Sequence, residues 1–161
     1  MGGHPIIDVA CGSGRNGIFL AQLGCSVICL DRDLSRLPND KLLNVSLKRH
    51  QMDLITDEWP FAERTIGGIL LVDFLHLPLF ENFERSLIPG GYFLIETVTG
   101  RGGNYLELPS AGELRNALKR TFELEFYRES KVGPENLDRV SVKVLARRKD
   151  FAGTTTNEQL V

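Results

Sequence analysis

Residues 8–17 read Asp-Val-Ala-Cys-Gly-Ser-Gly-Arg-Asn-Gly, and the elements around this glycine-rich stretch decide the fold. The apolar run from Pro5 to Ala10 leads into it, and a helical pattern from Ile18 to Leu23 follows it. Gly24 is well placed to end that helix, and the β-branched, apolar run from Ser26 to Leu30 comes next. This order of strand, loop, helix and strand predicts a βαβ unit, the building block of a parallel sheet.

The alternation of strands and helices continues along the chain. Three further strands are expected at Val45 to Met52, Ile69 to Val72 and Tyr92 to Glu96. Helices are expected from Leu79 to Leu87, closed by Pro89-Gly90-Gly91, and from Ser110 to about Arg120. Two late strands, Phe122 to Glu129 and Arg139 to Arg147, can pair as a hairpin. We therefore expect an α/β fold: a doubly wound, mostly parallel seven-stranded sheet with a C-terminal antiparallel hairpin, Rossmann-like in character.

Length and charge narrow the class of protein. The 161 residues suit one domain, expected over residues 1–149, and the polar, aperiodic stretch 150–161 is expected to be a disordered tail. The formal net charge of −2 is not the basic excess typical of proteins that bind nucleic acid, although a local basic patch stays open. No apolar run is long enough to span a bilayer and no signal peptide is visible, so we expect a cytoplasmic protein.

The three cysteines, Cys11, Cys25 and Cys29, are odd in number and lack the spacing of metal ligands. Buried, reduced thiols in a cytosolic protein are the expected interpretation, and no metal site is expected.

Four acids mark one edge of the predicted sheet. Asp31, Asp53 and Asp73 directly follow predicted strands, and Asp8 lies near the end of the first strand. Ligands of doubly wound sheets bind beyond the carboxyl ends of the strands, where the strand order reverses. We therefore place the functional site at this edge.

The glycine-rich stretch has two interpretations. Gly12, Gly14 and Gly17 match the G-x-G-x-x-G fingerprint of dinucleotide sites, and Asp31 follows at the distance expected for a ribose contact. Glycines let the backbone approach a ligand, and the following helix offers free N–H groups. A tight strand-to-helix turn, with Asp31 as a capping residue, would need the same residues. The joint order of turn, helix and acid favours a nucleotide-type ligand.

The first motif resembles a known family. The run from Asp8 to Asn16 resembles the first motif of class I S-adenosylmethionine-dependent methyltransferases, which place an acid several residues ahead of the glycines. The run from Leu87 to Gly91 is similar to the turn before the fifth strand of that superfamily. The Gly-Arg-Asn form, with Leu20-Ala21 and then Gly24, looks closest to the tellurite-resistance and thiopurine-type small-molecule branch. The resemblance extends over roughly residues 6 to 148.

The resemblance implies S-adenosylmethionine as the cofactor. In the family, the glycine loop holds the methionine part, which maps onto Gly12 and Gly14 here. The acid after the second strand holds the ribose, which maps onto Asp31. The family's first acid, here Asp8, orders the loop and can bind the cofactor's amino group through water.

Four more residues complete the implied cofactor site. Asp53 stands where the family often has an acid for the adenine amino group, with Leu54 beside it, but a turn-forming aspartate would look the same. Asp73 is also expected at the cofactor. Arg15 lies in the first turn of a helix, where a cation opposes the helix dipole, so Asp8 or the cofactor carboxylate is its expected partner. An exposed arginine without a partner is the alternative.

The sequence does not identify a catalytic residue, and His76, Asp73 and Tyr105 are the candidates. Methyl transfer to a soft or ionised nucleophile needs mainly alignment, and a general base only where the acceptor must lose a proton. The Asn/Asp-Pro-Pro-aromatic motif of nucleic-acid amino methyltransferases is replaced by Asp73-Phe74-Leu75-His76. A lone histidine in an apolar stretch is more often structural.

The loop from Gly100 to Leu108 suits a substrate-facing flap, or else an ordinary surface loop. We expect a small, soft or readily ionised acceptor, such as a thiol or a chalcogen oxyanion, held by Arg101, Asn104 or Tyr105. The aromatic pair Trp59 and Phe61 is expected in the core.

Three functions stay open. The first is a methyltransferase that acts on a small-molecule substrate. The second is a non-catalytic S-adenosylmethionine-binding or interaction module, because the helical segment that usually precedes the first strand in relatives is not in this sequence. The third is an NAD(P)-dependent oxidoreductase, which is disfavoured because no substrate domain is present and a hairpin ends the fold.

Overall fold

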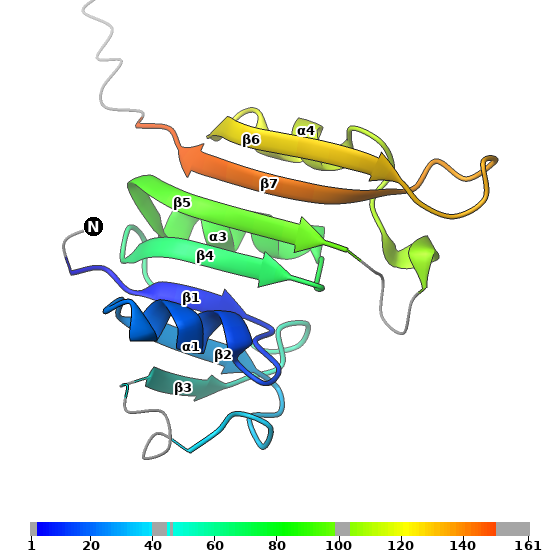
Figure 1. The fold of residues 1–161 in the computed structure, drawn as a ribbon. Helices are drawn as coiled ribbons and strands as arrows, with labels where there is room; N and C mark the ends of the chain where they lie inside the picture. The colour runs from blue at the N-terminus through cyan, green and yellow to red at the C-terminus, as the bar shows by residue number, and fades with distance from the viewer. Residues whose placement is uncertain (1–2, 40–44, 46, 99–103, 151–161) are drawn as a thin grey trace, which may run out of the picture.

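The structure, a computed structural model, describes residues 3–39, 45, 47–98 and 104–150. It is built on one seven-stranded sheet in the order β3-β2-β1-β4-β5-β7-β6 (Figure 1). The strands are β1 Ile6–Val9, β2 Val27–Asp31, β3 Leu47–Gln51, β4 Ile66–Val72, β5 Leu87–Thr97, β6 Phe122–Lys131 and β7 Val140–Arg148. The helices are α1 Arg15–Gln22, α3 Phe80–Ser86 and α4 Glu113–Leu118, with 3₁₀ turns η1 Leu77–Leu79 and η3 Tyr105–Glu107.

The pairing of the strands confirms the predicted fold class. Strands β1 to β5 are parallel to one another, and β7 is antiparallel to both β5 and β6. The strand order reverses between β1 and β4, so the carboxyl ends of β1, β2, β4 and β5 meet at one edge (Figure 1). That edge is the one at which the sequence placed the site.

Helix α1 ends as the sequence predicts. Gly24 has a φ of 87° in the left-handed region, where glycine carries no Cβ penalty. The N–H of Gly24 donates to the carbonyl of Ala21 at 3.0 Å, and the N–H of Cys25 donates to the carbonyl of Leu20 at 3.1 Å. These bonds satisfy carbonyls at the end of the helix and turn the chain into β2.

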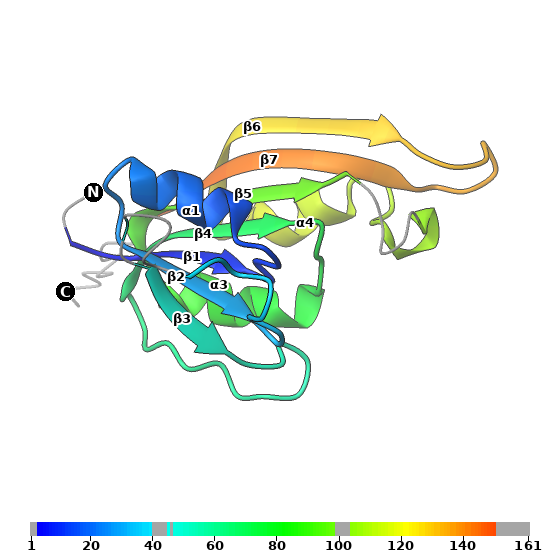
Figure 2. The same cartoon turned by 60° about the horizontal axis from the view of Figure 1, so that its bottom comes forward.

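The helices lie on both faces of the sheet. Figures 1 and 2 show α1 over β1 and β2 on one face, and α3 and α4 on the opposite face. The face under α3 and α4 holds the larger core, in which Phe93 contacts Phe83 and Phe122 with ring centroids 5.5 and 5.6 Å apart. The smaller core under α1 includes Ala21 and Cys29.

The expectation for the aromatic pair is confirmed. Trp59 and Phe61 pack against the larger core, and the rings of Trp59 and Phe83 are 5.1 Å apart. The indole N–H of Trp59 donates to the hydroxyl of Ser86 at 2.7 Å, so the polar atom of this half-buried ring has a partner.

The turn expected at Pro89-Gly90-Gly91 lies inside a strand. Ile66 of β4 pairs with Leu87, and Gly68 pairs with Tyr92, so the intervening residues of β5 form a bulge. Gly90, with a φ of 74°, permits this excursion, after which β5 rejoins β4.

The start of α4 also differs from the expectation. The helix begins at Glu113 rather than at Ser110, because Gly112 has a φ of 75° and precedes the first helical residue. The carboxylate of Glu113 accepts from the N–H of Ser110 at 2.8 Å, and that of Glu129 on β6 accepts from the N–H of Gly112 at 2.8 Å. The cation of Arg115 lies 4.0 Å from the ring centroid of Tyr127, which also ties α4 to β6.

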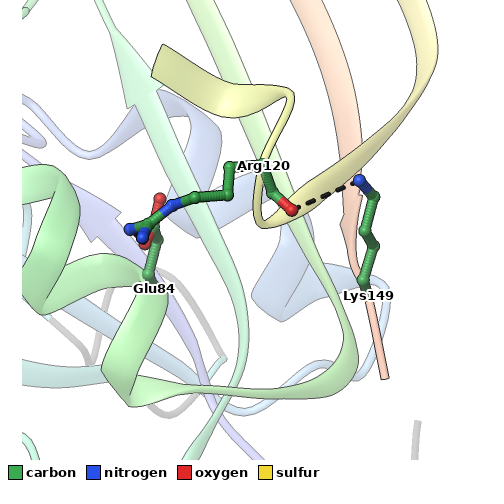
Figure 3. Close-up of polar contacts among 3 residues, drawn as sticks. All are labelled: Glu84, Arg120 and Lys149. Atoms are coloured by element: carbon green, nitrogen blue, oxygen red, sulfur yellow. Dashed lines mark hydrogen bonds and ion pairs between the residues drawn. The ribbon is translucent and has the colours of Figure 1, made fainter. Parts of the chain in front are cut away.

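Figure 3 shows the polar contacts of Arg120, which lies between α4 and β6. Arg120 lies 3.9 Å from the carboxylate of Glu84 on α3, and its carbonyl accepts from Lys149 Nζ at 3.2 Å. The expected tail, residues 150–161, lies outside the described residues except for Asp150. No helix in the described part of the chain is long and apolar enough to cross a membrane.

Candidate functional site

Four cavities formed by described residues lie along the carboxyl ends of the strands. We name each cavity after one of the residues that line it. The Asp53 cavity has a volume of about 300 Å³ and the Asp31 cavity about 340 Å³. The Asp8 cavity has a volume of about 250 Å³ and the Glu96 cavity about 490 Å³.

Neighbouring cavities share walls. Asp31 borders the Asp53 and Asp31 cavities, Gly12 borders the Asp31 and Asp8 cavities, and Arg15 borders the Asp8 and Glu96 cavities. Asp73 lines the last three of the four. The four cavities therefore form one groove across β2, β1, β4 and β5.

The three glycines of the first motif serve different purposes. A Cβ on Gly12 would meet no atom within 4 Å, so the backbone there is open to a ligand. A Cβ on Gly14 would lie 2.1 Å from Leu37 Cδ1, and one on Gly17 would lie 2.8 Å from the sulfur of Cys29. Gly14 and Gly17 thus allow close packing inside the protein, whereas Gly12 faces the groove.

Asp8 is a buried acid under the loop. Its side chain is 2% exposed, and its carboxylate accepts from the N–H of Gly17 at 2.8 Å. Burial raises the pKa of Asp8 to about 6; the Gly17 hydrogen bond opposes this shift and the nearby carboxylate of Asp31 adds to it. Asp8 therefore holds the start of α1 against the sheet and also lines a cavity.

The thiol of Cys11 lies in the same loop. A hydrogen bond with Cys29 raises the pKa of Cys11, and burial raises it further. The thiol is therefore neutral and a poor nucleophile. None of the three cysteines forms a disulfide, and no cluster of His, Cys, Asp or Glu in the described residues could hold a metal ion.

Asp31 organises the loop as well as the cavity. Its carboxylate accepts from the N–H of Gly12 at 2.7 Å and from the N–H of Asp33 at 3.0 Å. A carboxylate has about four acceptor positions, so both oxygens can still accept from a ligand. Both interpretations of Asp31, a turn residue and a ligand residue, are compatible with this geometry.

Asp53 and Leu54 lie together in the cavity that Asp31 also lines. The carboxylate of Asp53 accepts from the N–H of Ile55 at 2.9 Å, which is the turn-forming role considered as the alternative. Phe74 faces the same cavity and, with Leu54, gives it two apolar walls.

Arg15 and Asp73 stand at the centre of the groove. Arg15 is exposed at the first position of α1 and makes no ion pair with a described residue, including Asp8. Asp73 has a φ of 54°, unusual for a non-glycine residue, and its carboxylate makes no hydrogen bond or ion pair within the described part of the chain. Such backbone strain gathers at functional sites.

The other catalytic candidates are not among the described residues that line the groove. His76 precedes η1, and its carbonyl accepts from the N–H of Leu79 at 3.1 Å. The ring of Tyr105 packs against Gly133 in the β6–β7 turn, and the side chain of Asn104 accepts from the N–H of Leu106 at 3.1 Å. None of these three is among the described residues that line the four cavities. Arg101 lies outside the described residues.

Sequence reasoning missed Glu96, Asn16 and Arg36, which line the groove. Glu96 lies near the carboxyl end of β5, and the argument that selected Asp31, Asp53 and Asp73 applies equally to it. Asn16 and Arg36 carry no comparable local signal.

Comparison with known proteins now identifies the class. The chain matches the family described as methyltransferase domain over residues 7–95, more than half of its length. The chain belongs to this family, whose class I members use S-adenosylmethionine as cofactor, and the resemblance of the first motif is confirmed. The nicotinamide-dependent alternative is thereby set aside. No curated protein matches the sequence.

Solved structures with this fold include methyltransferases with different names, one of which refers to tRNA. TehB from Haemophilus influenzae is 19% identical with a TM-score of 0.69, over 93% of this chain and 59% of that chain. A TehB-like S-adenosylmethionine-dependent methyltransferase from Corynebacterium glutamicum is 24% identical with a TM-score of 0.63, over 92% and 81%. A tRNA (m1A58) methyltransferase from Aquifex aeolicus is 16% identical with a TM-score of 0.63, over 91% and 63%. This chain thus spans 59% of the TehB chain, and the shared fold does not select an acceptor.

Proposed function

We propose that this chain transfers a methyl group from S-adenosylmethionine to a small-molecule nucleophile in the cytoplasm. The observation that carries the proposal is the division of the groove: three connected cavities around the first motif, and a fourth that continues from them. A cofactor in the first three leaves the fourth for an acceptor. The absence of disulfides among the three cysteines supports the location.

The residues present fit the cofactor. The open backbone at Gly12 would accept the close approach of the ligand. Asp31 would accept from the ribose hydroxyls, and the slot of Leu54 and Phe74 would hold the adenine, with Asp53 at its polar edge. Arg15 offers a cation without an ion-pair partner among the described residues, which suits the cofactor carboxylate.

Asp8 and Asp73 would face the amino group of the cofactor, since both line the cavity that Arg15 also lines. When bound, S-adenosylmethionine supplies a methyl group on a positively charged sulfur. The protein's task is then to align the acceptor and to exclude water, which a groove with a partly apolar floor supports. A general base is required only for an acceptor that must lose a proton.

A small acceptor is supported by the size of the fourth cavity. Its volume of about 490 Å³ lies in the range of ordinary small-molecule pockets, roughly 300–1,000 Å³. The formal net charge of −2 gives a long polyanion little general attraction.

The test has two stages. S-adenosylhomocysteine should raise the melting temperature, whereas NADH should not, because only a ligand of the folded state stabilises it by mass action. A transfer assay with methyl-labelled cofactor then offers small amines, alcohols and thiols beside tRNA, rRNA and DNA. Labelling of nucleic acid alone would refute the small-molecule acceptor, and binding without any transfer would favour a non-catalytic module.

A further inference from the structure

The Glu96 cavity has an apolar floor with charged groups around it. Leu70 and Leu94 are paired across β4 and β5, and Val72 is paired with Glu96. All four line the cavity, on the sheet face that also carries Asp8 and α1. The alternate residues of β5, such as Phe93, are buried on the opposite face under α3 and α4.

Glu96 is held by an ion pair across the sheet. Lys143 is its partner in the antiparallel pairing of β5 with β7, and Lys143 Nζ lies 2.6 Å from the carboxylate. The side chain of Glu96 is 32% exposed and that of Lys143 is 57% exposed. Lys143 is not among the described residues that line the cavity, so the carboxylate is the charged group of this pair that faces it.

Among the described residues, the other charged side chains that line the cavity belong to Asp73 and Arg15. The N–H of Asp73 donates to the carbonyl of Glu96 at 2.9 Å, so the two acids stand at adjacent strand ends. In the proposed function Arg15 faces the carboxylate of the cofactor and Asp73 faces its amino group, which leaves the carboxylate of Glu96 toward the acceptor. A negatively charged acceptor group beside this carboxylate would be repelled, whereas an N–H or O–H group would find a hydrogen-bond acceptor.

We propose that Glu96, held by Lys143, is an acceptor-binding residue, and that the acceptor is a small molecule with an apolar body and an amine or hydroxyl group. The apolar body would lie on Leu70 and Leu94, and the N–H or O–H group would donate to the carboxylate of Glu96. The carboxylate of Glu96 disfavours anionic acceptors, including the chalcogen oxyanion expected from the sequence. This inference rests on the proposed function, because it assigns the acceptor of the same site.

The experiment compares three probes with one apolar body: 2-phenylethylamine, 2-phenylethanol and 3-phenylpropionate. Calorimetry first measures the affinity of S-adenosylhomocysteine for the protein and each variant, and then the affinity of each probe for the saturated complex. We expect the amine to bind at least about tenfold more tightly than the carboxylate, with the alcohol between them.

Two substitutions and a control test Glu96 directly. Glu96→Gln should weaken the amine about tenfold, and Glu96→Lys should reverse the order of amine and carboxylate. Glu123→Gln is the matched control, because Glu123 is an exposed acid opposite Arg147 on β7 and is not among the described residues that line the cavity. It should change none of the three affinities.

The inference is overturned if the wild-type complex binds none of the probes, if the carboxylate binds as tightly as the amine, or if Glu96→Gln leaves the amine within twofold of wild type. Failure of the proposed function would appear at the first step instead, as no binding of S-adenosylhomocysteine. A variant that does not fold would also fail to bind S-adenosylhomocysteine. In that case Glu96→Asp, which keeps the negative charge, tests the inference: it should still bind the amine more tightly than the carboxylate.

Discussion

The two faces of the sheet differ in how they are covered. The face under α3 and α4 is a continuous core, in which Phe83 and Phe93 are both fully buried. On the other face, α1 lies over β1 and β2, and the surface of β4, β5, β7 and β6 is more open (Figures 1 and 2). Phe126 on β6 is 50% exposed there. Folding stability is therefore concentrated on one face, and the Glu96 cavity lies on the other.

The open face continues the floor of the Glu96 cavity. Leu94 is paired with Leu145 of β7, and Leu145 with Phe126 of β6, which extends the apolar row that begins at Leu70. The row crosses four strands, or about 14 Å at the usual spacing of neighbouring strands. Substitutions along the row should leave the fold intact and change only what lies on it.

The largest expected effect is on the buried face. Phe93→Ala should lower the free energy of unfolding by about 3–5 kcal/mol, because it leaves a cavity between α3 and the sheet. The control Phe126→Ala removes the same side chain from the open face and should lower it by less than about 1 kcal/mol. Denaturant unfolding of both variants measures the difference, and equal losses would mean that the open face is not open in solution.

Parts of the fold and of the candidate site that depend on local sequence patterns could be predicted from the sequence. The acids at Asp31, Asp53 and Asp73 follow from a local rule, since an acid after a parallel strand lies at the ligand edge wherever the strand sits in the sheet. The hairpin follows from the turn at Gly133 in the same way. These predictions need no knowledge of distant contacts.

The surroundings of Tyr105, Glu96 and Gly14 depend on contacts with residues far away in the sequence, which local patterns do not predict. The ring of Tyr105 packs against Gly133, far along the chain, and the sequence around Tyr105 does not indicate this contact. The partner of Glu96 is Lys143, and their meeting requires β7 to insert beside β5. Gly14 is needed because Leu37 packs on it, which a motif in residues 12–17 cannot show.

The second prediction concerns the ligand edge. Asp31→Ala should weaken S-adenosylhomocysteine by about 2–3 kcal/mol, because charge-assisted hydrogen bonds to the ribose are lost. It should also lower the free energy of unfolding by about 1 kcal/mol, since the N–H groups of Gly12 and Asp33 lose their acceptor. Calorimetry and denaturant unfolding measure the two effects.

A second variant, Asp31→Asn, separates the loss of ligand affinity from the loss of stability. The amide oxygen can still accept from one of the two backbone N–H groups, so the loss of stability should be smaller than in the alanine variant, whereas the loss of affinity should remain. Undiminished affinity in both variants would leave Asp31 as a turn residue only.

The third prediction uses the pH dependence of Asp8. Burial, opposed by the Gly17 hydrogen bond, raises its pKa from 3.8 to about 6, so the folded state binds more protons than the unfolded state between these values. Stability therefore falls as the pH rises through this window, and the penalty is complete above about pH 6. Asp8→Asn should raise the free energy of unfolding by on the order of 2 kcal/mol at pH 7.5.

The same variant should show little advantage at pH 3.5, where Asp8 is protonated in the folded state and mostly protonated in the unfolded state. Unfolding of the ligand-free protein and of Asp8→Asn at the two pH values measures this difference. S-adenosylhomocysteine should bind the variant more weakly, because a neutral amide attracts the cofactor amino group less than a carboxylate. A variant no more stable than wild type at pH 7.5 would contradict the unfavourable burial of this acid.

The smallest effect is expected at His76. It lies between β4 and η1, its carbonyl is used within the turn, and it is not among the described residues that line the groove. His76→Ala should keep turnover within about threefold of wild type, which corresponds to less than about 0.7 kcal/mol of transition-state stabilisation. The measurement is the rate of labelled methyl transfer to the best acceptor at saturating cofactor, with Asp73→Ala as the comparison, since Asp73 lines three of the four cavities. A loss of a hundredfold or more in His76→Ala, with cofactor affinity unchanged, would identify His76 as a catalytic base although it is not among the described residues that line the groove.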